Sequence, residues 1–359
     1  MKWTSFALAI AFTPAVLSSL LADRGSKEIG LNQLARKAGL QYFGTAIDNP
    51  SLAPGGASYL PYSIDNSKYR KVAYNSEEFG QVTPANGLKW MFTEPSRGQF
   101  NYTLSDEIIK PAIKNGQFRR CHALVWHNQL PPWLTSQTWT ASELLSVVRT
   151  HIAAEVTHYK GQCLHWDVVN EAFNEDGTFR PSIFYNITGT GYIYEAFAAA
   201  AKADPKAKLY YNDYNIETVG PKSDSVRTLV KEMRKKGVKI DGVGLQSHFT
   251  VGGTPSYEAQ TANMAAFTKM DLDVAVTELD VRMQLPSNGM KLAQQAKDYN
   301  TSVMACKNTK RCVGITVWDF QDNFSWVPST FAGEGDPLPY SSTTEKKPAW
   351  YTIAKALRG

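Results

Sequence analysis

Two glutamates stand out as residues that could do chemistry. Glu171 stands just after the apolar run 164–169, and Glu278 just after the run 272–277. Glycoside hydrolysis uses such a pair: one carboxylic acid protonates the leaving oxygen, and one carboxylate meets the positive charge that develops at the anomeric carbon. Carboxyl groups about 5 to 5.5 Å apart allow nucleophilic attack and retention of configuration. The pair predicts a glycoside hydrolase, which is a retaining one if the two groups lie that close, although ion pairs at the rim of a fold would also account for two such glutamates.

The elements that must position these glutamates are short apolar runs that alternate with helix-like stretches. This alternation is typical of a parallel α/β fold, and a single barrel accounts for the length of 359 residues. We therefore expect an α/β fold, a single-domain (β/α)8 TIM barrel. The expected strands are residues 42–47, 79–83, 119–125, 164–169, 208–212, 242–245, 272–277 and 314–318.

The helix-like stretches lie between these runs. Residues 142–159 place apolar side chains on one stripe, with Ser142 as the expected cap. Residues 192–203 form a second stretch, and residues 223–236 form a third that Gly237 should end. No tract rich in Ser, Thr or Pro separates two regions of different composition, so we expect no accessory module.

In such a barrel, reactive residues stand at the C-terminal ends of the strands. Polar or aromatic residues follow four of the expected strands: Asn170 and Glu171, Gln246 to His248, Glu278, and Trp318 with Asp319. Two glutamates and an aromatic rim should therefore face one bowl.

The N-terminus has the pattern of a secretory signal. Met1 and Lys2 precede an apolar run at residues 3–21, and we expect cleavage between Ala15 and Ala22. The predicted organisation is a signal peptide at 1–22 and a catalytic domain at 23–359. A membrane anchor is the alternative, but Pro14 interrupts the run, and no other stretch approaches the roughly 20 apolar residues of a spanning helix. We expect a secreted, extracellular protein that does not bind membranes.

Cysteines and glycosylation sequons agree with export. Cys306 and Cys312 can close a small loop, and Cys121 with Cys163 is the remaining pair. No C-x-x-C motif supplies metal ligands at the usual spacing, so no metal is expected. N-glycosylation sequons begin at Asn101, Asn186, Asn300 and Asn323.

Composition limits the partners. The net charge of +5 is spread thinly, so the chain has no footprint for nucleic acid. The 9 Trp and 17 Tyr provide flat rings that stack on the apolar faces of sugars. A carbohydrate is therefore the expected partner, bound without a cofactor.

Seven segments together resemble glycoside hydrolase family 10, the retaining endo-1,4-β-xylanases, and specifically its fungal type. The resemblance covers nearly the whole chain after the N-terminal segment. The segments are Asn86-Gly87-Leu88-Lys89-Trp90, His122-Ala123-Leu124-Val125-Trp126-His127, Trp166-Asp167-Val168-Val169-Asn170-Glu171, Asn212-Asp213-Tyr214-Asn215, Gly244-Leu245-Gln246-Ser247-His248, Val276-Thr277-Glu278-Leu279-Asp280, and Trp318 with Ser325-Trp326.

The resemblance implies roles for individual residues. Glu171 takes the proton donor (acid/base) position and Glu278 the nucleophile position. His248 and Gln246 fall beside the nucleophile, and Asn170 serves the 2-hydroxyl of the sugar. The residues that match sugar subsites before the cleavage point are Asn86, Lys89, His122, Trp126 and Gln129, with Trp318 and Trp326 closing over them. The implied protein is a monomeric, secreted endo-1,4-β-xylanase that cleaves xylan by double displacement.

One position departs from the family pattern, which has Glu where this chain has Ala85. That Glu helps to hold the second sugar before the cleavage point. Losing a charge-assisted hydrogen bond costs about 1.5 to 3 kcal/mol, so grip on this sugar should be weaker. This departure keeps open a related glycosidase for another β-linked substrate, such as a tomatinase-like saponin deglycosylase. A barrel that binds glycan without cleaving it is a separate alternative, and the presence of both glutamates disfavours it.

Overall fold

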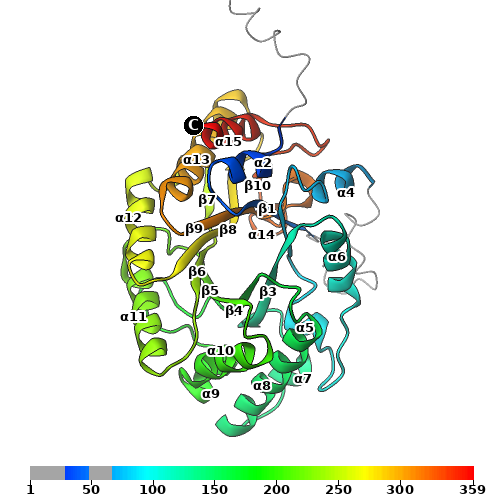
Figure 1. The fold of residues 1–359 in the computed structure, drawn as a ribbon, viewed down its shortest axis with the longest axis vertical. Helices are drawn as coiled ribbons and strands as arrows, with labels where there is room; N and C mark the ends of the chain where they lie inside the picture. Colours follow the sequence, from blue (N-terminus) through cyan, green and yellow to red (C-terminus); the bar gives the residue numbers. More distant parts are fainter. Residues whose placement is uncertain (1–28, 48–66) are drawn as a thin grey trace, which may run out of the picture.

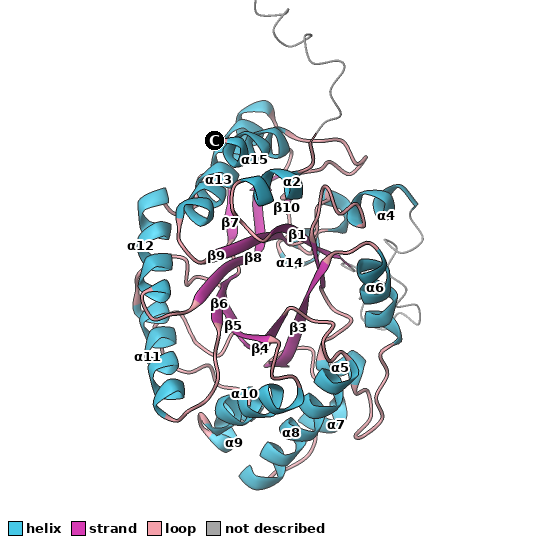
Figure 2. Ribbon diagram, in the orientation of Figure 1, coloured by secondary structure: helices cyan, strands magenta, loops and turns pink. Residues whose placement is uncertain are grey.

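The computed structural model describes residues 29–47 and 67–359. Eight parallel strands close into a barrel that helices surround, as seen along the barrel in Figures 1 and 2. The predicted single-domain (β/α)8 barrel is confirmed. The expected signal peptide at 1–22 lies outside the described residues.

The elements have the following bounds. The strands are β1 (Tyr42–Ile47), β2 (Gln81–Pro84), β3 (Phe118–Trp126), β4 (His165–Asn170), β5 (Lys208–Asp213), β6 (Gly242–Leu245), β7 (His248–Thr250), β8 (Asp273–Gln284), β9 (Cys312–Val317) and β10 (Glu334–Gly335). The helices are α2 (Leu31–Lys37), α4 (Ser67–Ala73), α5 (Trp90–Thr93), α6 (Thr103–Lys114), α7 (Pro132–Thr135), α8 (Ala141–His158), α9 (Ile183–Thr188), α10 (Gly191–Ala203), α11 (Pro221–Lys235), α12 (Tyr257–Thr268), α13 (Gly289–Asn308), α14 (Val327–Thr330) and α15 (Pro348–Arg358), with a 3-10 turn, η1, at Asp322–Phe324.

The barrel strands follow one another in chain order. Each of β1 to β5 pairs with the next strand, β6 pairs with β8, and β9 closes the ring by pairing with both β8 and β1. The C-terminal ends of all eight strands therefore meet at one mouth. This topology brings β4, which carries Asn170, to the same mouth as β8, which carries Glu278.

Strand β8 is longer than the sequence predicted. The run 272–277 was expected to end before Glu278, yet β8 continues to Gln284. The extension has its own partners, because His248 in β7 pairs with Asp280 and Glu334 in β10 pairs with Gln284. Glu278 therefore lies within a continuous strand, which restricts its backbone more than a loop would.

The predicted cap of α8 is wrong. Thr140, not Ser142, is the N-cap: its side chain accepts from the backbone N–H of Glu143, whose carboxylate accepts in turn from the N–H of Thr140. This reciprocal pair is a capping box. At the end of α11, Gly237 adopts a φ of 71°, as its predicted role as a helix stop requires.

Large buried side chains fill the interior of the barrel. Arg120 forms a buried ion pair with Asp167 and lies 4.7 Å from the ring centre of Tyr210. A Cβ atom on Gly242 would come within 2.4 Å of the Tyr210 ring. Glycine at this position therefore lets a tyrosine fit inside the barrel.

Both predicted disulfides form. Cys121–Cys163 joins β3 to the residue two positions before β4, and Cys306–Cys312 joins the end of α13 to the start of β9. Asn101, Asn186 and Asn323 are exposed and Asn300 is partly exposed, so all four sequons reach the surface. Within the described ranges, the structure contains no helix that is both long and apolar enough to span a membrane.

Candidate active site

A cleft of about 860 Å3 opens at the C-terminal mouth of the barrel. Glu171 and Glu278 both line it, so the two carboxyl groups that the sequence singled out face one cavity. It also contains all ten residues predicted to bind substrate. These are Asn86, Lys89, His122, Trp126, Gln129, Asn170, Gln246, His248, Trp318 and Trp326.

Glu278 is 5% exposed and is held from two sides. Asn212 Nδ2 donates to Glu278 Oε1 at 2.7 Å, and His248 Nε2 lies 3.2 Å from Oε2. His122 Nδ1 lies 3.9 Å from Oε1. Burial alone would raise the pKa of Glu278, but the hydrogen bond from His248 and the charges of His122 and His248 outweigh it and lower that pKa. The surroundings therefore favour the ionised carboxylate.

His248 carries the charge that supports Glu278. Its Nδ1 lies 2.9 Å from Asp280 Oδ2, which also accepts a hydrogen bond of 2.7 Å from Trp326 Nε1. Burial opposes a charged imidazole, yet Asp280 and Glu278 together raise the pKa of His248 to about 10. His248 is therefore protonated at neutral pH.

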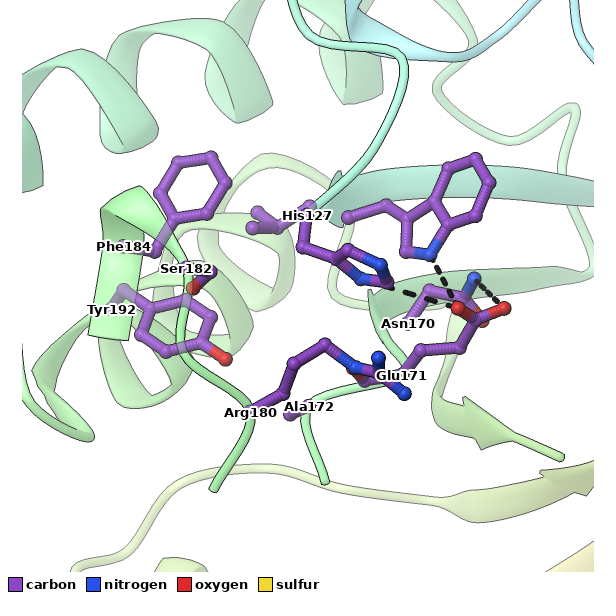
Figure 3. A pocket seen from close by; sticks show the side chains of 10 residues that line it. His127, Asn170, Glu171, Ala172, Arg180, Ser182, Phe184 and Tyr192 are labelled. Atoms are coloured by element: carbon purple, nitrogen blue, oxygen red, sulfur yellow. Dashed lines mark hydrogen bonds and ion pairs between the residues drawn. The ribbon is translucent and has the colours of Figure 1, made fainter. Parts of the chain in front are cut away.

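Glu171 has different neighbours. Trp126 Nε1 donates to Glu171 Oε2 at 2.8 Å, while Gln246 Nε2 and Asn170 Nδ2 lie 3.1 Å and 3.2 Å from Oε1. His127 Nδ1 lies 4.0 Å from Oε2 (Figure 3). The carboxyl group is thus oriented by neutral N–H donors, in contrast to Glu278.

The backbone beneath Glu171 is unusual. Glu171 has a φ of 57°, in the left-handed region that a side chain rarely adopts. Arg180 Nε donates to the carbonyl oxygen of Glu171, and the Arg180 side chain points toward Glu171 beside a cavity of about 10 Å3 that both residues line (Figure 3). Strain of this kind persists only where surrounding contacts hold it, and it gathers at functional sites.

Two amides connect the carboxyl groups. Asn212 Nδ2 donates both to Glu278 Oε1 and to Asn170 Oδ1, the latter at 2.9 Å. Asn170 in turn donates to Glu171, so the bridge runs without a gap. Thr277 Oγ1 donates to Asn212 Oδ1 and fixes which end of that amide faces the glutamates.

Gln246 differs in part from its expected place beside Glu278. Its carbonyl oxygen accepts from the N–H of Glu278, as a neighbour should. Its side-chain amide, however, points to Glu171 and Asn170. The side chain therefore orients Glu171 and not Glu278.

A polar cluster lies at the β2 and β3 side of the cleft. Lys89 Nζ donates to Asn86 Oδ1 at 3.1 Å and lies 4.6 Å from the ring centre of Trp126. Gln129 Nε2 donates to the same Asn86 oxygen at 3.3 Å. These predicted sugar-contacting residues form one connected group.

Aromatic rings also line the cleft. The Trp318 ring lies 5.2 Å from His122 and 6.4 Å from His248, and Trp326 lies 4.9 Å from His248. Both indoles face the cleft that holds the glutamates. This places flat rings beside the space that a sugar would fill.

Ala85 is fully buried and packs with Ala46 and Trp318. It does not line the cleft, whereas the neighbouring Asn86 does. A longer side chain at position 85 would start from beneath the Trp318 platform.

Asn212, which is buried behind the cleft, and several residues that line the cleft were not predicted as site residues. Asn212 was recognised only as part of a motif, yet it contacts Glu278 directly. Tyr214 and Asn215 of the same motif line the cleft, and so do Arg282 and Phe331. Arg282 lies 4.0 Å from the Phe331 ring centre. The motif around Asn212 was a usable signal for three of them, but no local pattern marks the other two.

The described residues hold no group of three or more His, Cys, Asp or Glu side chains suited to bind a metal ion.

Comparison with known proteins gives consistent matches. A family model described as Glycosyl hydrolase family 10 matches residues 30–356. The chain is 53% identical over 328 residues to Endo-1,4-beta-xylanase D of Talaromyces funiculosus, which covers 91% of this chain and 77% of that protein. It is 46% identical over 332 residues to Endo-1,4-beta-xylanase A of Humicola insolens, covering 92% of this chain and 87% of that one.

Solved structures match equally well. The Penicillium canescens endo-1,4-beta-xylanase XylE aligns with a TM-score of 0.87 at 46% identity, covering 92% of this chain and 98% of that chain. A xylanase of the same family from Bispora sp. MEY-1, crystallised with xylobiose, gives a TM-score of 0.85 at 44% identity, with coverage of 91% and 99%.

Proposed function

The chain belongs to glycosyl hydrolase family 10, and we propose that it is an endo-1,4-β-xylanase in which Glu278 is the nucleophile and Glu171 the acid/base. It hydrolyses internal β-1,4 linkages of xylan with retention of configuration. The observation that supports this most is the contrast between the two carboxyl groups in one cleft. Charged and amide donors favour the ionised form of Glu278, while neutral donors orient Glu171.

The reaction proceeds in two steps. In the first, Glu278 attacks the anomeric carbon while Glu171 protonates the departing oxygen, which forms a covalent glycosyl-enzyme. In the second, Glu171 removes a proton from water, and the hydroxide displaces Glu278. Each step inverts the anomeric carbon, so the product keeps the β configuration.

The surrounding residues support these steps. The amide bridge through Asn170 and Asn212 lies next to Glu278, where it can also bind the 2-hydroxyl of the reacting sugar. Trp318 stacks against that sugar, and Asn86 with Lys89 binds the hydroxyls of the next one. Polar side chains and flat rings suit an uncharged pentose.

Product analysis on glucuronoxylan tests the activity directly. Release of a series of xylo-oligosaccharides, with no sugar released from carboxymethylcellulose, is the expected result. Release of xylose alone would contradict the endo mode. Absence of any xylo-oligomer would favour the saponin-type alternative instead.

We predict that His248→Asn shifts the acid limb of the kcat/KM profile to higher pH. His248 lowers the pKa of Glu278 through a hydrogen bond and its charge, so its removal lets burial raise that pKa. The nucleophile is then ionised only at higher pH. Initial rates on an aryl β-xylobioside from pH 3 to 8 measure the shift.

His248 also contributes to the stability of the fold, and this contribution decreases as pH rises. A folded pKa of about 10 means that its stabilisation is complete below the ordinary value of 6.5 and is lost as pH rises through about 10.

His158→Asn, on the exposed end of α8, is the matched control for the pH profile of His248→Asn. An acid limb unchanged in His248→Asn would contradict the role of His248.

We predict that Ala85→Glu raises kcat/KM on xylotetraose about tenfold, because a charge-assisted hydrogen bond to the second sugar would be gained. The new side chain starts next to Asn86 in the chain and beneath the Trp318 ring, from where its carboxylate can extend toward the cleft. Ala85→Gln, which is similar in size but uncharged, is the control and should gain less. A folded Ala85→Glu enzyme without any gain would contradict the account of a weakened subsite.

The protein is also expected to be secreted and monomeric. The N-terminal pattern and the two disulfides support export, since disulfides persist in oxidising compartments. N-terminal sequencing of protein recovered from the culture medium tests the predicted cleavage between Ala15 and Ala22. Light scattering of the same sample tests the oligomeric state.

A further inference from the structure

A short helix behind the cleft links the residues at the second sugar. Lys89 is the N-cap of the one-turn helix α5, and its N–H donates to the carbonyl oxygen of Asn86 at 2.8 Å. The N–H of Met91, within α5, donates to the carbonyl oxygen of Gln129 at 3.1 Å. Asn86, Lys89 and Gln129 therefore share one support, and the orientation of α5 sets where all three stand.

The opposite side of α5 rests on a buried polar network. The Trp90 ring lies flat on the ring of His151, with 3.8 Å between centroids and 6° between planes. Trp90 Nε1 donates to Glu94 Oε2 at 3.0 Å, and His151 Nδ1 lies 3.0 Å from the same oxygen. Glu94 Oε1 accepts from the N–H of Gly98 at 2.8 Å. Glu94 thus holds both the tryptophan of α5 and the histidine beneath it.

Glu155 lies at the far end of this network. Its Oε2 lies 3.3 Å from Nε2 of His151, which is one helical turn earlier on α8. The same oxygen accepts a hydrogen bond of 3.0 Å from Oγ1 of Thr93, the last residue of α5. Both His151 and Glu155 are 0% exposed. Glu155 does not line the cleft, so it cannot act on substrate directly.

The protonation states follow from this burial. Burial raises the pKa of Glu155 well above its ordinary value, and the charge of Glu94 raises it further, against the hydrogen bond from Thr93. Burial also lowers the pKa of His151, although Glu94 opposes this. A neutral imidazole between the two glutamates has one N–H, and Glu94 needs it on Nδ1 because Glu94 is an acceptor there. The backbone of Leu124 also hydrogen-bonds the His151 ring, but its carbonyl can only accept. His151 Nε2 is then an acceptor that requires a donor, and the O–H of a protonated Glu155, 3.3 Å away, can supply it.

We propose that Glu155 is a positioning residue: its uncharged carboxyl group donates to His151 Nε2, which fixes the imidazole N–H toward Glu94 and so holds α5 and the second sugar site in place. This inference rests on the proposed xylanase function of the cleft. It gives Glu155, on the outer helix α8, a supporting role in sugar binding. Glu155 acts through Trp90 and does not touch the sugar.

The test uses two substrates that differ by one sugar. An aryl β-xyloside fills only the sugar site at Glu278, whereas an aryl β-xylobioside also needs Asn86 and Lys89. Glu155→Leu removes the donor at similar size. We expect kcat/KM for the xylobioside to fall about tenfold, as for one loosened hydrogen-bonded contact, with the xyloside unchanged.

Glu155→Gln should restore the xylobioside rate, because an amide N–H2 at the position of Oε2 can donate one N–H to His151 Nε2 and the other to Thr93 Oγ1, whose hydroxyl can turn to accept it. An ion pair between a charged Glu155 and a charged His151 would not survive this change. Selective loss of the xylobioside rate in Glu155→Gln would therefore overturn the proposal, as would an equal loss on both substrates in a folded Glu155→Leu.

The tautomer can be measured without any variant of Glu155. In protein labelled with 15N-histidine, the ring shifts of His151 should show a protonated Nδ1 and an unprotonated Nε2, with His151→Gln used to assign the signals. A doubly protonated ring at neutral pH would overturn the proposal even if Glu155→Leu failed to fold. A wild-type enzyme inactive on both substrates would instead count against the proposed xylanase function.

Discussion

Glu278→Ala should abolish xylan hydrolysis while leaving the fold intact. The variant lacks the group that attacks the anomeric carbon, and loss of an enzymic nucleophile costs about 10^6-fold in kcat. Azide should restore turnover of an activated aryl β-xylobioside, because the small anion fits the vacated space beside Asn212 and His248. A single displacement inverts the anomeric carbon, so the product should be the α-glycosyl azide. Rates with and without azide, with NMR of the product, make the measurement.

The matched control is Glu258→Ala. Glu258 is exposed in the first turn of α12 on the outside of the barrel, so the variant should keep wild-type activity. Equal thermal unfolding of both variants would show that Glu278→Ala loses chemistry and not structure. A β-azide from Glu278→Ala, or substantial activity on xylan without azide, would contradict the assignment.

Glu171→Ala should separate substrates by their leaving group. Cleavage of xylan should fall about 10^2- to 10^4-fold, the usual contribution of a general acid and base. A dinitrophenyl β-xylobioside, whose leaving group needs no proton, should still form the glycosyl-enzyme. Hydrolysis of that intermediate should be slow, because no base activates water. Stopped-flow release of dinitrophenol should therefore show a burst followed by a slow steady state.

Azide distinguishes Glu171 from Glu278. In Glu171→Ala it should attack the intermediate from the face that water would use, and yield the β-glycosyl azide with the original configuration. Gln246→Ala serves as the comparison, since this side chain orients Glu171 without transferring a proton. An equal loss on xylan and on the dinitrophenyl substrate would argue against an acid/base role for Glu171.

The barrel could be predicted well because a local run of apolar residues marks each strand. Strands β1 and β6 have the bounds that their apolar runs indicated. The extension of β8 was missed because its partners, β7 and β10, are strands of only three and two residues that lie elsewhere in the chain. The cap at Thr140 was missed for another reason. Thr140 and Glu143 have the spacing of a capping box, but the apolar stripe of the helix, on which the prediction rested, begins only at Leu144.

The residues of the candidate site could also be predicted only in part. Glu171, Glu278 and the cleft residues of the quoted motifs could be predicted because most of them lie in or just after apolar runs that lead to the mouth. The partners of each carboxyl group could not, because a hydrogen bond such as that between Asn212 and Glu278 depends on side-chain rotamers across the barrel. Phe331 and Arg282 reach the cleft from the region after η1 and from the β8 extension, which no strand-end argument covers.

The central claim is that Glu278 bonds covalently to the sugar during the reaction. A 2-deoxy-2-fluoro-β-xylobioside with an activated leaving group should trap this state, because the fluorine slows its hydrolysis more than its formation. Peptide mapping by mass spectrometry should place one fluoroxylobiosyl group on the peptide that contains Glu278 and on no other. A label on Glu171, or an intact enzyme without any label after the leaving group has been released, would contradict the account.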